Sequence, residues 1–142
     1  MDTKMQTRST DEAHTQAAAS RLVAICHSAA VNGGWWRDLR TGEDLRSRGG
    51  EPAKRNVPEM LCLIHSEISE AMEGHRKNRR DDHLTHRPML EVELADALIR
   101  IFDLAGGLGL DVPGALVEKL AYNARRADHK PENRLLEGGK AF

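Results

Sequence analysis

The sequence has few aromatic residues, few cysteines, no long apolar run and almost no net charge. Aromatic residues make up 4% of the 142 positions, so aliphatic side chains must supply most of the core. The two cysteines, Cys26 and Cys62, fall in helical patterns and are expected to be reduced, buried thiols, which favours a cytoplasmic protein. No apolar run approaches the roughly 18 residues that span a membrane, and residues 1–9 lack the apolar segment of a signal peptide.

Charge is balanced along the chain, with 21 basic and 22 acidic residues. A protein of this kind has no global positive field, which argues against a nucleic-acid polymer as its partner. An anionic ligand must therefore be met by local groups.

Composition favours an all-α protein, because Ala, Leu, Glu and Arg are abundant and no run of alternating β-branched residues predicts a sheet. We expect a disordered N-terminus (1–9), a single domain (10–130) and an irregular C-terminal tail (131–142). Capping residues, Pro and Gly predict four helices. They are expected at about 10–32, 57–77, 88–109 and 112–128, with a long polar loop at 35–56 and a charged connector at 78–87.

Two pairs of acidic residues stand out on the second and third predicted helices. Glu67 and Glu70, like Glu93 and Asp96, are spaced i, i+3, so both members of each pair project from one side of a helix. Glu67 also falls within the apolar arc that should face the core, where an ionised carboxylate is costly unless a cation or donor compensates it.

The third predicted helix is apolar around most of its circumference and should be largely buried, in part against a second subunit. Its polar residues form one narrow strip: Glu93, Asp96, Arg100 and Asp103. Four converging carboxylates repel one another, and hard oxygen ligands of this kind suit Mg²⁺ or Mn²⁺. Because Mg²⁺ often also binds substrate phosphates, the pattern predicts cleavage of a phosphate ester or phosphoanhydride. The alternative is a set of solvated acidic faces, paired with Arg100, Arg76 or Lys77.

The pattern SEISE, followed after 22 residues by ELAD, resembles the MazG-like family of all-α nucleoside triphosphate pyrophosphohydrolases. The family motif is EExxE, a variable gap and ExxD, and a basic segment similar to Lys119–Arg126 follows it. One residue departs from the motif: Ser66 stands where the first Glu is expected. The resemblance covers about residues 57–130.

The resemblance implies that the protomer is a four-helix bundle and that it forms a homodimer or homotetramer through apolar helix faces. It implies hydrolysis of a ribo- or deoxyribonucleoside triphosphate to the monophosphate and pyrophosphate, as housekeeping of the nucleotide pool. Glu67, Glu70, Glu93 and Asp96 match the family's metal positions. We expect bound Mg²⁺, or Mn²⁺, to neutralise the triphosphate and activate a water molecule, with Glu67 or Glu70 assisting as a base.

Further residues are candidates for contacts with the substrate. Lys119, Asn123 and Arg126 share one face of the fourth predicted helix and are expected to clamp phosphate, although a solvated basic face explains them as well. Trp35 or Trp36 is expected to stack on the nucleobase, or the pair covers the end of the bundle. Lys54 precedes the second helix and is within reach of phosphate or base, or is ordinary solvated charge.

Two other functions stay open from the sequence. A phosphoribosyl-ATP pyrophosphohydrolase would use the same all-α chemistry on a different substrate. A non-catalytic helical oligomer, acting as an adaptor, would use the acidic strip as a salt-bridge seam and would not respond to Mg²⁺.

Overall fold

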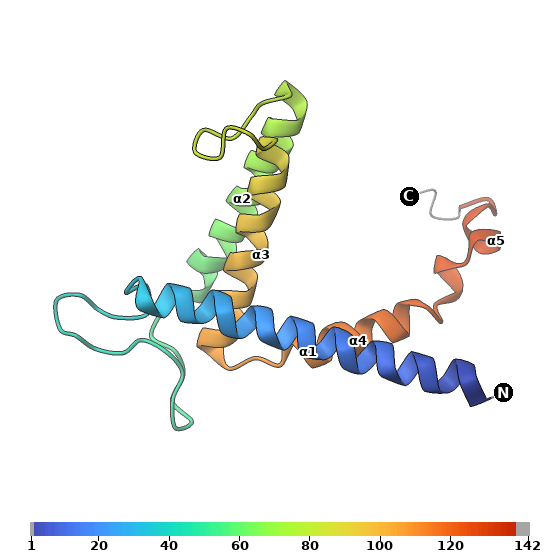
Figure 1. Ribbon diagram of the computed structural model, residues 1–142, viewed down its shortest axis with the longest axis horizontal. Coiled ribbons are helices and arrows are strands. Elements are labelled where there is room, and N and C mark those ends of the chain that lie inside the picture. The colour runs from blue at the N-terminus through green and yellow to red at the C-terminus, as the bar shows by residue number, and fades with distance from the viewer. Residues whose placement is uncertain (1, 139–142) are drawn as a thin grey trace. The chain divides into compact units, whose positions relative to one another are not determined.

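The computed structural model describes residues 2–138, with side chains from Thr10 onward, and is helical as the composition predicts. Figure 1 labels the α-helices in chain order. Their bounds are α1 (Asp2–Asn32), α2 (Val57–Lys77), α3 (Met89–Leu108), α4 (Val112–Asn123) and α5 (Pro131–Arg134), with a 3₁₀ helix at Ala127–His129. Among the described residues the only β pairing consists of isolated bridges, such as that between Arg37 and Asp44. None of the helices in this part of the chain has the length and apolar character needed to cross a bilayer.

Capping residues explain most of the helix boundaries. Asn56 accepts a hydrogen bond from the backbone N–H of Glu59 at the start of α2, and Asp111 does the same for Gly114 in α4. The α3 helix ends at Gly109, whose φ of 67° is a left-handed conformation that glycine adopts without strain. These boundaries of α2 and α3 are those expected from the sequence.

Two boundaries differ from the expectation. The first helix begins at Asp2 rather than near Ser9 or Thr10, since residues 2–9 contain good helix formers such as Lys, Met, Gln and Arg. The fourth helix ends at Asn123 rather than at Asp128. Arg126 has extended backbone angles, and its side chain pairs with Asp128, a contact between residues two apart that a continuous α-helix would not allow.

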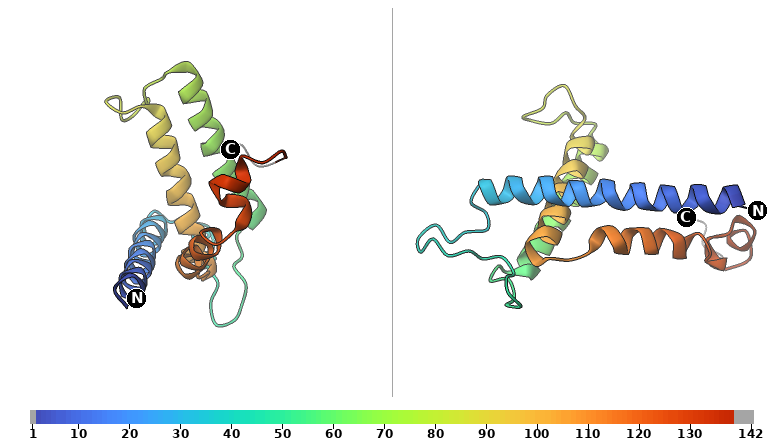
Figure 2. Two further views of the ribbon diagram at one scale, coloured as in Figure 1. Left: turned by 90° about the vertical axis from the view of Figure 1, so that its right-hand side faces the viewer. Right: turned by 60° about the horizontal axis from the view of Figure 1, so that its bottom comes forward.

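The described chain divides into two compact units, so the domain expected over residues 10–130 spans parts of both. One unit is Arg21–Leu110, called here the 21–110 unit; the other contains the described residues up to Ser20 and from Asp111. Within the 21–110 unit, α2 and α3 pack against each other as an antiparallel hairpin (Figures 1 and 2).

Trp36, Met60 and Leu104 form the buried core of the 21–110 unit, with Ile64, Leu108 and other partly buried residues around them. A Cβ atom added to Gly107 would lie 2.0 Å from the Trp36 ring, so this helix position has to be glycine for the indole to pack. The Trp36 indole therefore fixes the start of the 35–56 loop against α3. Backbone hydrogen bonds from Ser47 to Gly107 and from Leu45 to Trp36 order the loop further.

Candidate metal centre and adjoining cavity

Three of the four predicted metal ligands come together between α2 and α3. Glu67, Glu93 and Asp96 each offer a carboxylate oxygen, and these oxygens lie within 4.8 Å of one another. Glu67 and Glu93 are buried, each 7% exposed, whereas Asp96 is partly exposed. We call these three residues the acidic cluster.

The packing of the helix hairpin explains why the acidic cluster forms. Ala71 and Ala97 lie one turn after Glu67 and Glu93 on their helices and are each only 3% exposed. Small side chains at these positions let the two backbones approach closely. The i, i+3 and i, i+4 spacings then direct the carboxylates into the same seam as the alanines.

Crowding and burial work against ionisation of the acidic cluster. Burial, the charge of Glu70 and a hydrogen bond with Glu67 raise the pKa of Glu93 from its ordinary value of 4.5 to about 7. Burial, followed by the charge of Glu67, also raises the pKa of Asp96. The protein therefore holds a concentration of negative charge that its own cations do not fully compensate.

Arg100 is the one basic residue of the polar strip on α3, and it contacts the acidic cluster. Its Nε atom donates to Glu67 Oε1 at 2.6 Å, while its side chain remains 43% exposed. The other two bases considered from the sequence, Arg76 and Lys77, pair with Glu73 instead. Only Arg100 therefore matches the salt-bridge alternative drawn from the sequence.

Glu70, the fourth predicted ligand, lies outside the three-residue acidic cluster and is exposed. Its charge is still close enough to raise the pKa of Glu93. Ser66, which replaces the first Glu of the family motif, donates its hydroxyl to the Leu63 carbonyl at 2.7 Å and is part of the helix surface.

The chemistry of this donor set fits a hard divalent cation. Carboxylate oxygens from two rigid helices are the ligands that Mg²⁺ and Mn²⁺ prefer, and the raised pKa values identify charge that a cation would compensate. Ligands on packed helices are also held more firmly than ligands on loops. The residues that would hold the ion are Glu67, Glu93 and Asp96, with Glu70 next to them.

A cavity of about 440 Å³ adjoins the acidic cluster within the 21–110 unit. Its wall is formed by the C-terminal part of α1, the head of the 35–56 loop, α2 and α3. Asp96 lines it and belongs to the acidic cluster as well, and Arg100, which contacts the cluster, also lines it. This volume falls in the range of small-molecule sites. Five further residues line the cavity or order its wall: His27, Trp35, Trp36, Arg55 and Asp103.

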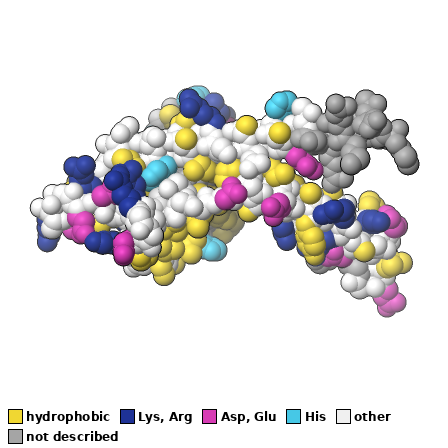
Figure 3. All heavy atoms as spheres, turned by 90° about the horizontal axis from the view of Figure 1, so that it is seen from below, with side chains coloured by type: hydrophobic (Ala, Val, Ile, Leu, Met, Phe, Trp, Pro, Cys, Tyr) yellow, Lys and Arg dark blue, Asp and Glu magenta, His cyan; other side chains and the backbone are white. Residues whose placement is uncertain are grey.

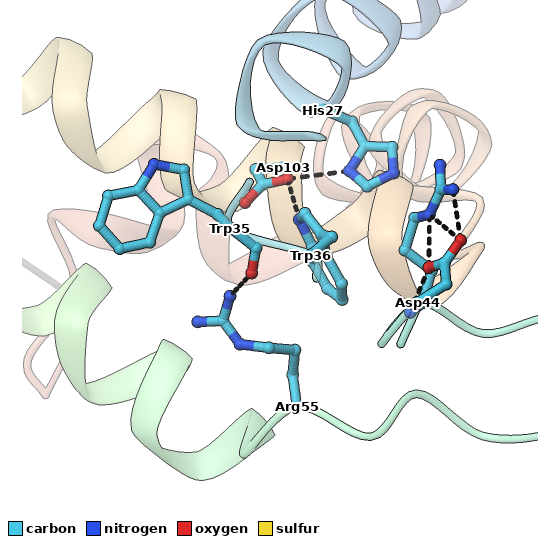
Figure 4. Close-up of polar contacts among 7 residues, drawn as sticks. His27, Trp35, Trp36, Asp44, Arg55 and Asp103 are labelled. Carbon is cyan, nitrogen blue, oxygen red and sulfur yellow. Dashed lines mark hydrogen bonds and ion pairs between the residues drawn. The ribbon is translucent and has the colours of Figure 1, made fainter. Parts of the chain in front are cut away.

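The two tryptophans that the sequence could not separate have different environments. Trp36 is 2% exposed and donates from Nε1 to Asp103 Oδ1 at 2.7 Å. His27 Nδ1 contacts the same oxygen at 2.9 Å, and its ring meets the Trp36 ring edge to face (Figure 4). Trp35 is 69% exposed and lines the cavity. Trp36 therefore belongs to the core, and Trp35 is the indole available to a ligand.

Of the basic residues before α2, Arg55 rather than Lys54 lines the cavity. Arg55 donates from Nη1 to the backbone carbonyl of Trp35, and its guanidinium lies 5.5 Å from the centre of the Trp36 ring. Lys54 pairs with Glu43 in the loop. Arg55 thus ties the two tryptophans to the start of α2 (Figure 4).

The remaining predicted substrate residues lie in the other compact unit. Lys119 and Asn123 are on α4, and the Lys119 ammonium lies 4.8 Å from the centre of the Tyr122 ring. Arg126 follows the end of α4, so the helical face predicted for these three residues does not extend to it. Arg126 forms a two-point ion pair with Asp128. The Asn123 Oδ1 atom is buried and has no hydrogen-bond partner among the described residues.

Sequence reasoning placed Asp103 on the polar strip of α3 but gave it no role, and it did not consider His27. Asp103 follows Asp96 by seven residues, which is two turns on the same helix face, so the helical period alone was a usable signal. The His27 contact joins residues 76 positions apart and leaves no local pattern. Neither cysteine forms a disulfide, as expected, but neither is fully buried: Cys26 is partly buried and Cys62 is exposed.

Comparison of the chain with protein-family models, with curated proteins and with solved structures finds no match in any of the three.

Proposed function

We propose that the 21–110 unit carries the site of an Mg²⁺-dependent nucleoside triphosphate pyrophosphohydrolase. Water would add to the α-phosphorus of a ribo- or deoxyribonucleoside triphosphate. The bond from that phosphorus to the bridging oxygen would break, releasing the monophosphate and pyrophosphate. The family resemblance of the two acidic motifs suggests this reaction.

One observation carries the proposal: Asp96 belongs both to the acidic cluster and to the cavity wall. A ligand in the cavity would therefore have its charged end next to the carboxylates. Three carboxylates repel a triphosphate by themselves, so the arrangement is productive only with a cation between them. Trp35 supplies an exposed aromatic surface in the same cavity for a nucleobase.

The roles of the residues follow from their positions. Glu67, Glu93 and Asp96 would hold the ion, which supplies charge neutralisation for the triphosphate and acidifies the attacking water. Glu70 or Glu67 would take the proton from that water. Arg100 would exchange its contact with Glu67 for one with phosphate, since its side chain is already partly exposed.

We also propose that the protein acts as a homo-oligomer. Large apolar side chains on both helices of the hairpin remain at the surface, although the sequence predicts that α3 should be largely buried. They are Leu61, Ile68 and Met72 on α2 and Leu94, Leu98 and Ile99 on α3. Hydrophobic side chains are also visible at the surface in the space-filling view (Figure 3). A second copy would remove such surface from water.

The contact between Arg100 and Glu67 favours a second candidate, a non-catalytic helical oligomer. In this alternative the acidic cluster is a structural seam, and Arg100 compensates it permanently. The protein would then gain no stability from Mg²⁺, whereas a metal site gains stability by mass action.

The test of the proposed function is product analysis. The protein would be incubated with the common ribo- and deoxyribonucleoside triphosphates and with phosphoribosyl-ATP, with and without Mg²⁺. Glu67→Gln and the control Glu59→Gln, an exposed residue in the first turn of α2, would run in parallel. We expect monophosphate and pyrophosphate, dependent on Mg²⁺, lost in Glu67→Gln and retained in Glu59→Gln. Absence of turnover together with no effect of Mg²⁺ on the melting temperature would favour the structural seam.

A further inference from the structure

The cavity contains a second acidic residue, Asp103, which the proposed chemistry does not use. It lines the same wall as Asp96, two turns further along α3, or about 10 Å along the helix axis. Its side chain is 13% exposed, so it is largely withdrawn from water. This distance leaves room for a nucleoside between the acidic cluster and Asp103.

Asp103 presents one oxygen to the protein and one to the cavity side. Trp36 Nε1 and His27 Nδ1 both contact Oδ1, at 2.7 and 2.9 Å. No hydrogen bond to Oδ2 is formed by any residue in the described part of the chain. Figure 4 shows this second oxygen pointing away from His27, to the side on which Trp35 lies.

The indole of Trp36 makes this orientation unambiguous, because an indole N–H only donates. Oδ1 must therefore be an acceptor, and Oδ2 is left as an acceptor for a ligand. A carboxylate oxygen that has no donor and belongs to a largely withdrawn side chain on the cavity wall favours a ligand N–H. It disfavours a ligand carbonyl, which would place two acceptors against each other.

We propose that Asp103 is a specificity-determining residue that selects nucleobases bearing an exocyclic amino group. The base would lie against Trp35, and its amino group would donate to Asp103 Oδ2. Cytosine and adenine present such a group where uracil and hypoxanthine present a carbonyl. This inference rests on the proposed function for its substrate class, but it concerns the base and not the hydrolysis.

Matched nucleotide pairs test the proposal because the members of each pair differ only at the exocyclic group and at the ring nitrogen beside it. That nitrogen is an acceptor in cytosine and adenine and an N–H donor in uracil and hypoxanthine. The affinities of dCMP and dUMP, and of dAMP and dIMP, would be measured by titration calorimetry. Turnover of the corresponding triphosphates would be measured with Mg²⁺. We expect the amino-bearing member to be preferred about tenfold to a hundredfold in the wild-type protein, the range of one hydrogen bond to a charged group.

The variant Asp103→Asn gives a result that a general loss of structure would not. Trp36 must still face an acceptor, so the amide oxygen would occupy the Oδ1 position and the amide NH₂ the Oδ2 position. The cavity then presents a donor, and the preference should reverse toward the carbonyl-bearing member of each pair. Asp82→Asn makes the same chemical change on the exposed connector and should leave the preference unchanged. Melting temperatures would show that both variants fold.

The outcomes separate the role of Asp103 from the proposed hydrolysis. Turnover without a base preference, or an Asp103→Asn variant that keeps the wild-type preference, overturns the role of Asp103 and leaves the proposed hydrolysis standing. The protein could instead bind the amino-bearing monophosphates more tightly, lose that order in Asp103→Asn in favour of the carbonyl-bearing ones, and hydrolyse no triphosphate. This result supports the role of Asp103 and contradicts the proposed hydrolysis. If the protein neither binds nor hydrolyses any nucleotide, both the role of Asp103 and the proposed hydrolysis are contradicted.

Discussion

Replacing Glu93 with glutamine should increase the stability of the metal-free protein at alkaline pH, although it removes a buried charged residue. The folded-state pKa of Glu93 is raised to about 7 from an ordinary value of 4.5. A carboxyl group with a raised pKa contributes stability that is fully present below its unfolded-state pKa. That contribution is lost as the pH rises through the folded-state pKa. The loss therefore falls between about pH 4.5 and pH 7.

The size of the effect follows from the pKa difference. The difference between a pKa of about 7 in the folded state and 4.5 in the unfolded state corresponds to roughly 3 kcal/mol. Glu93 is 7% exposed, so solvent screening removes little of this value. Glutamine has almost the same shape, keeps the hydrogen-bonding capacity and cannot ionise. The variant should therefore be about as stable as the wild type near pH 5 and about 2–3 kcal/mol more stable near pH 8.

Urea unfolding in the presence of a chelator, followed by far-ultraviolet circular dichroism, would measure this difference at the two pH values. Glu91→Gln is the matched control, because Glu91 lies on the same helix, pairs with Arg87 and is 54% exposed. Its substitution should change the free energy of unfolding by less than about 1 kcal/mol at either pH. A Glu93→Gln variant that is less stable than the wild type near pH 8 would refute the account of crowded carboxylates.

Three further predictions concern the neighbouring contacts. Gly107→Ala should lower the free energy of unfolding by about 1–3 kcal/mol in urea titrations, because the new Cβ would meet the Trp36 ring; unchanged stability would mean that the indole packs elsewhere. Trp36→Phe should lower the free energy of unfolding by about 1.5–3 kcal/mol, because the hydrogen bond to Asp103 is lost. Trp35→Phe changes an exposed side chain and should alter the melting temperature little. Arg100→Gln should tighten Mg²⁺ binding in calorimetry, because it removes the cation that competes for Glu67; an unchanged affinity would show that Arg100 does not compete.

The helices were largely predictable because their signals are local. Asn56 with Pro58, and Asp111 with Pro113, mark the starts of α2 and α4, and Gly109 marks the end of α3. The early end of α4 was not predictable, since residues 124–128 are rich in helix formers, yet Arg126 has extended backbone angles and pairs with Asp128. The same misjudged helix end extended the face shared by Lys119 and Asn123 to Arg126, which lies beyond α4.

The acidic cluster was predictable in part for the same reason. Its i, i+3 spacings are visible in the sequence, and the hairpin of α2 and α3 brings Glu67, Glu93 and Asp96 together. The choice between Trp35 and Trp36 was not predictable, because it depends on a glycine and an acceptor on α3, more than 60 residues away. Long-range contacts of this kind determine which polar residue receives a buried partner, and no local pattern encodes them.

The central claim is that Glu67, Glu93 and Asp96 form a divalent cation site rather than a structural seam. Calorimetric titration of the protein with Mg²⁺ tests it most directly, using the wild type, Glu93→Gln and the control Glu91→Gln. The account predicts saturable binding to the wild type and to Glu91→Gln, and its loss in Glu93→Gln. Absence of binding to the wild type, or equal binding to all three proteins, would contradict it.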